Sequence, residues 1–194
     1  MKQLISLRIN KQPAPEKGDI LCSEPFLLDQ EFSRSVILIC EHNEEGSFGL
    51  ILNKKLDIEI HSIIEDIPET QIPIHIGGPV EQNQLFYLHQ DTEIRDSIGV
   101  NSELFLGGDY NQLKEKINNK SLYATNMRFF IGYSGWEKGQ LQREVDELSW
   151  VVIKHVDASL IFDNKPEELW KKLISLQGGK YKHMSEYPAN PSLN

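Results

Sequence analysis

Four residues with acid–base or hydrogen-bonding side chains stand directly after apolar, strand-like runs of the sequence. Glu41 and His42 follow one such run, Asn53 follows a second and His89 a third. Polar side chains at strand ends reach the rim of a sheet, so strands that end together would gather them into one concave patch. Because the unperturbed pKa of histidine is about 6.5, an enzyme that uses His42 or His89 as general base is one hypothesis.

Glycine-rich segments add possible ligand contacts to this predicted rim. Gly77 and Gly78 would let backbone amides approach a ligand, and a helix that begins near Gly139 would add unpaired N–H groups that favour an anion. The competing interpretation is that all these groups satisfy turns and strand ends by hydrogen bonds, with the aromatic residues in the core. The predicted pocket comprises Glu41, His42, Asn53, Gly77, Gly78, Pro79, His89, Tyr133, Gly135, Trp136, Gln140 and Glu144.

Nucleophile and metal motifs are incomplete. Ser134 lies in a glycine-rich segment like the nucleophile elbow of a hydrolase, but Trp136 stands where that motif requires glycine. Cys40 and His42 are two residues apart, so they could share a strand face with Cys22 as a third ligand; a zinc site, however, needs three or four clustered ligands. Small buried cysteines are the favoured interpretation, and we predict no catalytic residue, metal or cofactor.

Composition and charge narrow the class of protein. The 194 residues carry 29 acidic and 20 basic side chains, a net charge of −9, which repels nucleic-acid phosphates, so direct nucleic-acid binding is disfavoured. The two cysteines lack a paired spacing and indicate reduced thiols. No apolar run reaches the roughly 18 residues of a membrane span, and no secretory signal is visible. We expect a cytoplasmic protein without membrane contact.

Hydrophobic periodicity predicts one α+β domain over residues 18–178, between a flexible arm (1–17, with a short strand or helix at Leu4–Ile9) and a mobile tail (179–194). A helix is expected from Asp57, with isoleucines at helical spacing, until Pro68 ends it. Asp109 is expected to cap another helix. Further helices are predicted after Gly139 and from Pro166 to Gly178. Strands are predicted at 19–22, 35–41, 47–53, 72–76, 85–89, 127–133 and 150–154. A short extended segment is expected at 160–162, a hairpin loop at 42–46 and a turn at 132–135.

Several of these segments together resemble one family of bacterial proteins. They are Gly18-Asp-Ile-Leu with Pro25 and Phe32, Glu41-His42, the stretch from Gly46 to Asn53, Gly77-Gly-Pro-Val80, Leu88-His89, and Gly132-Tyr-Ser-Gly-Trp136 followed by Gly139-Gln-Leu141 and Glu144. In this order they are similar to the AlgH/YqgE family. Ser134 stands where that family more often has alanine, and Asn53 lacks the arginine and proline that often follow it there.

The resemblance implies a branched, mixed β-sheet curled into a pseudo-barrel with flanking helices. Many family members carry the label of transcriptional regulator, but no DNA-binding motif is visible in this sequence. From the incomplete catalytic motifs we expect a non-enzymatic, cytoplasmic regulatory or binding module. Its partner is expected to be a small molecule or a protein.

Overall fold

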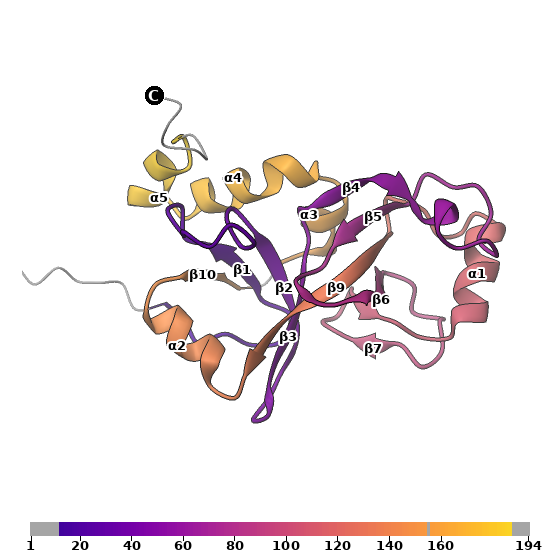
Figure 1. Cartoon of the computed structure of the whole chain (residues 1–194), viewed down its shortest axis with the longest axis horizontal. Helices are drawn as coiled ribbons and strands as arrows, with labels where there is room; N and C mark the ends of the chain where they lie inside the picture. Colours follow the sequence, from indigo (N-terminus) through magenta and orange to yellow (C-terminus); the bar gives the residue numbers. More distant parts are fainter. Residues whose placement is uncertain (1–11, 155, 188–194) are drawn as a thin grey trace, which may run out of the picture.

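A computed structural model describes residues 12–154 and 156–187 of the chain. The segment Leu4–Ile9, predicted as a short strand or helix, lies outside these residues. The fold is α+β (Figure 1). Its strands are β1 (Ile20–Ser23), β2 (Val36–His42), β3 (Gly46–Ile51), β4 (Lys55–Glu59), β5 (Pro73–Ile76), β6 (Val80–His89), β7 (Ile98–Gly99), β8 (Phe105–Leu106), β9 (Met127–Glu137) and β10 (Trp150–Ile153). The helices are η1 (Ile60–Ser62), a 3₁₀ turn, and α1 (Tyr110–Asn118), α2 (Gln140–Asp146), α3 (Ala158–Phe162), α4 (Pro166–Leu176) and α5 (Gly179–Met184).

The sheet is branched and mixed, as the family resemblance implies, and β9 is the strand at which it branches. Its main path runs β10-β1-β2-β3-β9-β6-β8-β7, with β4 and β5 off this path. The first half of β9 pairs with β5 in parallel, with Phe129 beside Ile74, and its second half pairs with β3 antiparallel, with Ser134 beside Gly49. Strand β6 pairs along the other side of β9. The sheet curls around this strand without closing into a barrel.

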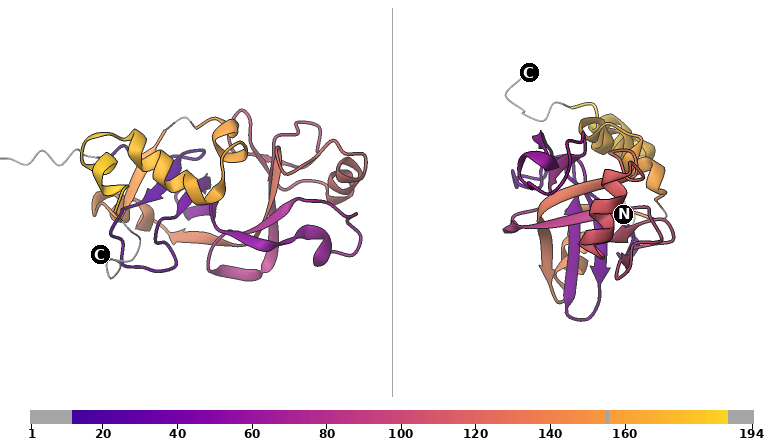
Figure 2. Two further views of the ribbon diagram at one scale, coloured as in Figure 1. Left: turned by 90° about the horizontal axis from the view of Figure 1, so that it is seen from above. Right: turned by 90° about the vertical axis from the view of Figure 1, so that its right-hand side faces the viewer.

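Helices cover the curled sheet from several sides and bury three apolar clusters. Helices α3 and α4 pack on one face of β1–β3, where Trp170 and Leu173 are each 2% exposed. Helix α2 covers the opposite face of these strands through Leu141 and Val145. Helix α1 closes the far end of the molecule over β5 and the start of β9. Figure 2 shows the C-terminal helices layered on one side of the sheet. Each large apolar side chain buried in this way contributes about 1.5–3 kcal/mol.

Elements with strong local signals form where the sequence predicts them. Strand β2 is buried from Val36 to Cys40, and the Asn43 side chain accepts hydrogen bonds from two backbone amides of the hairpin turn that follows. The Asp109 carboxylate accepts hydrogen bonds from the Asn111 and Gln112 amides and caps α1. These features depend on neighbouring residues alone.

The helix expected from Asp57 is wrong. Residues 55–59 form β4, which pairs with β5, and only the 3₁₀ turn η1 follows. The strand pairs with β5, and the Ile60 amide still donates to the Ile72 carbonyl, so long-range pairing prevails over the helical spacing that begins at Ile60. Ile63, predicted on the buried face, is 50% exposed.

Four smaller expectations also change. The segment at 160–162 belongs to helix α3 and is not extended. No turn interrupts residues 132–135, because β9 continues through both glycines to Glu137. The helix predicted from Pro166 to Gly178 is expected to bury Leu169, Trp170, Leu173, Ile174 and Leu176 on one face, but Leu176 is 68% exposed. Helix α5 occupies the start of the predicted tail, so regular structure extends past Gly178. None of the helices in the described part of the chain has the length and apolar character needed to cross a membrane.

Candidate functional site

An open cleft of about 570 Å³ lies where the β2–β3 hairpin, the second half of β9 and the start of α2 meet. The antiparallel pairing of β3 with β9 builds it, because this pairing brings the hairpin and α2 to one end of the sheet (Figure 1). Of the predicted pocket residues, the cleft is lined by Glu41, Tyr133, Gly135, Trp136 and Gln140.

Aromatic rings form the floor of this cleft. The ring centroids of Phe48 of β3 and Tyr133 of β9, which both line the cleft, lie 4.8 Å apart, and Phe86 of β6, outside the lining, lies 5.3 Å from Phe48. All three side chains are half-buried. Gly135 makes room for this arrangement, because a Cβ atom there would stand 3.1 Å from the Tyr133 ring. The floor therefore contains two half-buried aromatic side chains, Phe48 and Tyr133, which also pack against the core.

Carboxylates surround this floor. Glu41, Glu45 and Glu137 line the cleft and are exposed, whereas none of the described residues that line it is a lysine or an arginine. Glu41 accepts a hydrogen bond of 2.8 Å from the Asn43 side chain, and the other two carboxylates make no side-chain contact within the described chain. The expectation that this site favours an anion is thus reversed, because the cleft is acidic.

Gln140 lines the cleft from α2, and Glu144 on the same helix supports it without lining the cleft. One Glu144 oxygen accepts hydrogen bonds from the indole nitrogens of Trp136 (2.9 Å) and Trp150 (2.8 Å), and the other accepts from the Gln140 amide at 2.9 Å. The Gln140 oxygen in turn accepts from the Glu137 backbone amide. Because these polar atoms are already bonded, Glu144 and Gln140 hold the wall in place.

The structure does not bring His42 or Asn53 into the cleft. His42 lies next to Glu41 on β2, and neighbouring strand residues face opposite sides; its Nδ1 lies 2.7 Å from the Ser47 hydroxyl. Asn53 lies at the other end of these strands. Its side-chain oxygen accepts a hydrogen bond from the Val36 amide, and its side-chain nitrogen donates to the Arg34 carbonyl, each at 2.8 Å. About 20 Å of strand separates the two ends.

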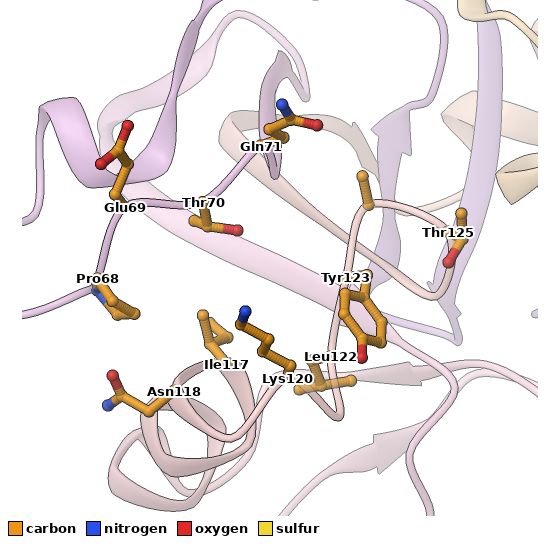
Figure 3. Close-up of a pocket in the computed structure, with 11 residues that line it drawn as sticks. Pro68, Glu69, Thr70, Gln71, Ile117, Asn118, Lys120, Leu122, Tyr123 and Thr125 are labelled. Atoms are coloured by element: carbon orange, nitrogen blue, oxygen red, sulfur yellow. The ribbon is translucent and has the colours of Figure 1, made fainter.

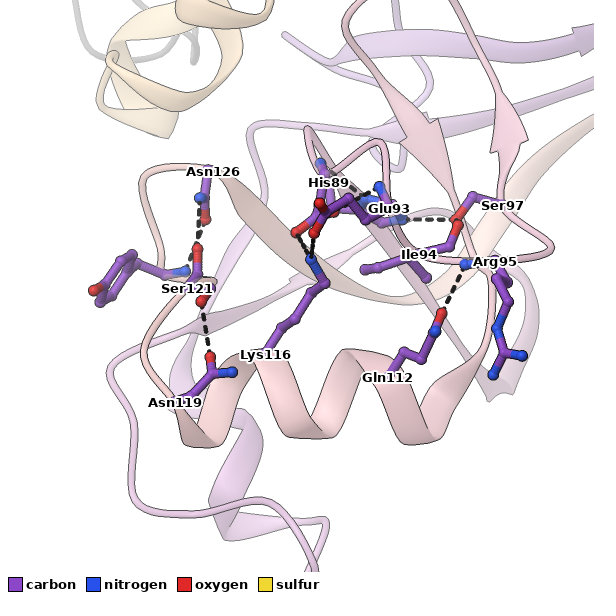
Figure 4. A network of polar contacts seen from close by, with 12 residues as sticks. His89, Glu93, Ile94, Arg95, Ser97, Gln112, Lys116, Asn119, Ser121 and Asn126 are labelled. Carbon is purple, nitrogen blue, oxygen red and sulfur yellow. Dashed lines mark hydrogen bonds and ion pairs between the residues drawn. The ribbon is translucent and has the colours of Figure 1, made fainter.

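His89 lies still farther away, beside the start of β9, about 30 Å of strand from Glu137. It is fully buried; its Nε2 donates to the Gly107 carbonyl at 2.9 Å, and its Nδ1 accepts from the Asp91 amide at 3.2 Å. Figure 4 shows His89 close to Ser97, beside the ion pairs of Lys116 from α1. Burial lowers the pKa of His89. With both ring nitrogens engaged, this histidine has a structural role, and the geometry does not favour a general base.

The double glycine predicted to approach a ligand instead approaches backbone. A Cβ atom at Gly77 would stand 2.2 Å from the Gly132 oxygen, and one at Gly78 would stand 2.2 Å from the Tyr133 carbonyl. Gly77 also bonds to both β3 and β9 through its backbone. Gly77, Gly78 and the following Pro79 therefore form the junction at which the sheet branches, and only Val80 beyond them lines the cleft.

The candidate nucleophiles are buried. Ser134 is fully buried, and its hydroxyl donates to the Gly77 carbonyl at 3.1 Å. Cys22 and Cys40 are free thiols whose pKa burial raises well above the ordinary value. Within residues 12–154 and 156–187, no group of three or more His, Cys, Asp or Glu side chains could hold a metal ion.

Several cleft residues were absent from the sequence prediction. Phe48 lies inside the predicted strand at 47–53, but the sequence does not show which side chains lie beside it. Glu45 and Glu137 are surface charges whose relation depends on β3 pairing with β9. No local signal identifies residues that long-range pairing brings together.

Comparisons with known proteins agree with the fold and the motifs. A sequence model described as AlgH-like matches residues 20–182. The chain belongs to the AlgH-like family. It is 43% identical over 180 residues to a UPF0301 protein of Cytophaga hutchinsonii, and the alignment covers 92% of this chain and 98% of the relative. A UPF0301 protein of Parabacteroides distasonis is also 43% identical, over 93% of this chain and 92% of its own.

Solved structures show the same fold for this AlgH-like chain. The solution structure of the AlgH protein from Pseudomonas aeruginosa superposes with a TM-score of 0.69 at 26% identity, over 92% of this chain and 98% of that one. A crystal structure of a protein from Corynebacterium diphtheriae gives a TM-score of 0.74 at 24% identity, over 91% and 94% of the two chains. These relatives carry no description of a reaction or ligand.

Proposed function

We propose that this AlgH-like chain is a non-enzymatic binding module whose protein partner inserts a positively charged side chain into the acidic aromatic cleft. One observation carries the proposal: Phe48 and Tyr133 present half-buried rings between exposed carboxylates, and no lysine or arginine among the described lining residues neutralises them. Aromatic faces and carboxylates both attract cations, and arginine can contact both at once.

The cellular role that follows is regulation in the cytoplasm through a protein partner. The net charge of −9 opposes direct contact with DNA, so any influence on transcription would pass through that partner. An enzyme with His42 or His89 as general base gains no support, because the two histidines lie at different ends of the sheet.

Binding of matched peptides tests this proposal. Three otherwise identical peptides carry arginine, lysine or neutral citrulline at one position, and their affinities are measured by calorimetry at low and high salt. We expect the arginine and lysine peptides to bind and the citrulline peptide to bind at least several-fold more weakly. The affinity of the charged peptides should fall with salt, because opposite charges attract them to the cleft.

Variants locate the contact. Tyr133→Leu should weaken arginine-peptide binding roughly 2- to 30-fold, as expected for a lost cation–π contact of about 0.5–2 kcal/mol. Glu137→Gln should also weaken it, whereas the matched control Glu65→Gln, an exposed carboxylate outside the cleft, should not. Equal binding of the citrulline peptide, or an equal effect of Glu65→Gln, would show that the cleft is not a cation site.

A further inference from the structure

A second cavity, of about 490 Å³, lies at the other end of the molecule, between the loop at 68–71 and the C-terminal end of α1 with the loop at 120–125. Its volume falls in the usual range for small-molecule sites, roughly 300–1,000 Å³. It is separate from the acidic aromatic cleft: α1 and α2 lie at opposite ends of Figure 1. No motif in the sequence pointed to it.

Apolar and polar side chains both line this cavity. Ile117 and Leu122, 4% and 2% exposed, form the inner wall together with Pro68 and Ala124. The hydroxyl groups of Thr70, Thr125 and Tyr123 and the amides of Gln71 and Asn118 line the rest, and none of these side-chain groups makes a hydrogen bond within the described chain.

Lys120 supplies a positive charge that has no partner. Its ammonium forms no ion pair or hydrogen bond with any residue that the structure describes. In Figure 3 its side chain extends into the space between α1 and the 68–71 loop, whereas the Glu69 carboxylate points away from that space. A ligand that enters here therefore meets a cation over an apolar wall.

The backbone of Lys120 is in a conformation that favours glycine. Its φ angle is +61°, and it follows Asn119, the C-cap of α1. Helices most often place glycine at this position, because a Cβ atom raises the energy of the left-handed conformation. The chain thus carries a lysine where a glycine would stabilise the fold.

From these observations we propose that this cavity binds a small monocarboxylate with an apolar or aromatic body. The carboxylate would contact Lys120, and the body would lie on Ile117 and Leu122. A phosphate or a dicarboxylate is disfavoured, because no second cation among the described lining residues faces Lys120, Glu69 stands at the rim, and the whole chain is acidic.

Three probes with the same aromatic body and different head groups test the ligand class: phenylacetate, phenylacetamide and phenethylamine. Titrated into the full chain at millimolar concentration and followed by amide NMR shifts, only phenylacetate should perturb residues 68–71 and 117–125. Equal perturbation by the amide or the amine, or the absence of shifts at these residues, overturns the proposal.

Lys120→Gly separates ligand binding from folding. This variant should weaken phenylacetate binding roughly 10- to 100-fold, the effect expected for a charge-assisted hydrogen bond. Its melting temperature should stay equal or rise by about 2–4 °C, because glycine relieves the left-handed residue. Lys120→Arg should retain binding, and Lys138→Gln, which removes an exposed lysine beside α2, should leave it unchanged. Unchanged affinity in Lys120→Gly would overturn the proposal whatever its stability.

Discussion

Replacing His75 with leucine should make the chain more stable, and increasingly so as the pH falls. His75 on β5 is fully buried, and its ring centroid lies 5.6 Å from that of Phe130. Neither ring nitrogen meets hydrogen-bond geometry with a described residue, although backbone groups of Phe129 and Pro73 interact weakly with the ring. Burial, reinforced by the positive charges of Arg128 and Lys55, lowers the pKa of His75 to about 3. The folded chain therefore holds a neutral, unpaired imidazole.

The sign of the pH dependence follows from this lowered pKa. The unfolded chain binds a proton at His75 below its ordinary pKa of 6.5, whereas the folded chain does not until about pH 3. Acid thus favours the unfolded state, and the free energy of unfolding falls through this window by up to about 1.4 kcal/mol per pH unit. Between pH 7 and pH 5 the loss due to His75 is about 2 kcal/mol.

Urea unfolding of wild type and His75→Leu at pH 7, 6 and 5 measures this effect. At pH 7 the variant should be more stable by roughly 1 kcal/mol, because it removes two unpaired buried nitrogens at the expense of some ring packing. At pH 5 its advantage should be about 2 kcal/mol larger.

His89→Leu is the matched comparison, because both ring nitrogens of His89 are hydrogen-bonded. This change should destabilise the chain at pH 7 by roughly 1–3 kcal/mol. A stability difference between His75→Leu and wild type that is the same at pH 5 and pH 7 would refute the assignment of a neutral, unpaired His75.

Other predictions test the junction and the walls of the sheet. Glu144→Ala leaves two buried indole N–H groups unpaired, so it should lower the free energy of unfolding by roughly 2–4 kcal/mol and change tryptophan fluorescence. Glu144→Gln should have a milder effect. Equal stability of Glu144→Ala and wild type in urea would contradict this. Gly77→Ala places a Cβ atom 2.2 Å from the Gly132 oxygen. We therefore expect a loss of more than about 3 kcal/mol in the free energy of unfolding, or no folded protein by circular dichroism. A normal melting curve would contradict the close backbone packing at this junction. Asp109→Ala removes the cap of α1 and should cost about 0.5–2 kcal/mol in thermal unfolding, whereas no change would mean that the cap contributes nothing.

Short-range signals in the sequence determined a good part of this fold. The apolar run of β2, the Asn43 turn, the Asp109 cap and the apolar face of α4 depend on residues a few positions apart, so periodicity and turn chemistry predict them. The motifs between Gly18 and Glu144 likewise indicate the family, because a motif is an order of residue types along the chain. Composition and charge disfavour a nucleic-acid surface on similar grounds, since a net charge requires no spatial arrangement.

Tertiary structure decided which residues share a site. Pairing with β5 makes residues 55–59 a strand, which takes 57–59 out of the helix expected from Asp57, and β9 continues through the glycines that predicted a turn. Strand ends that look alike in the sequence lie far apart, because β2 and β3 pair antiparallel, so that Asn53 and His42 lie at opposite ends of the pair. The acidic aromatic cleft exists because Phe48 and Tyr133, far apart in the chain, meet through hydrogen bonds between β3 and β9, and a linear sequence does not record such long-range pairing.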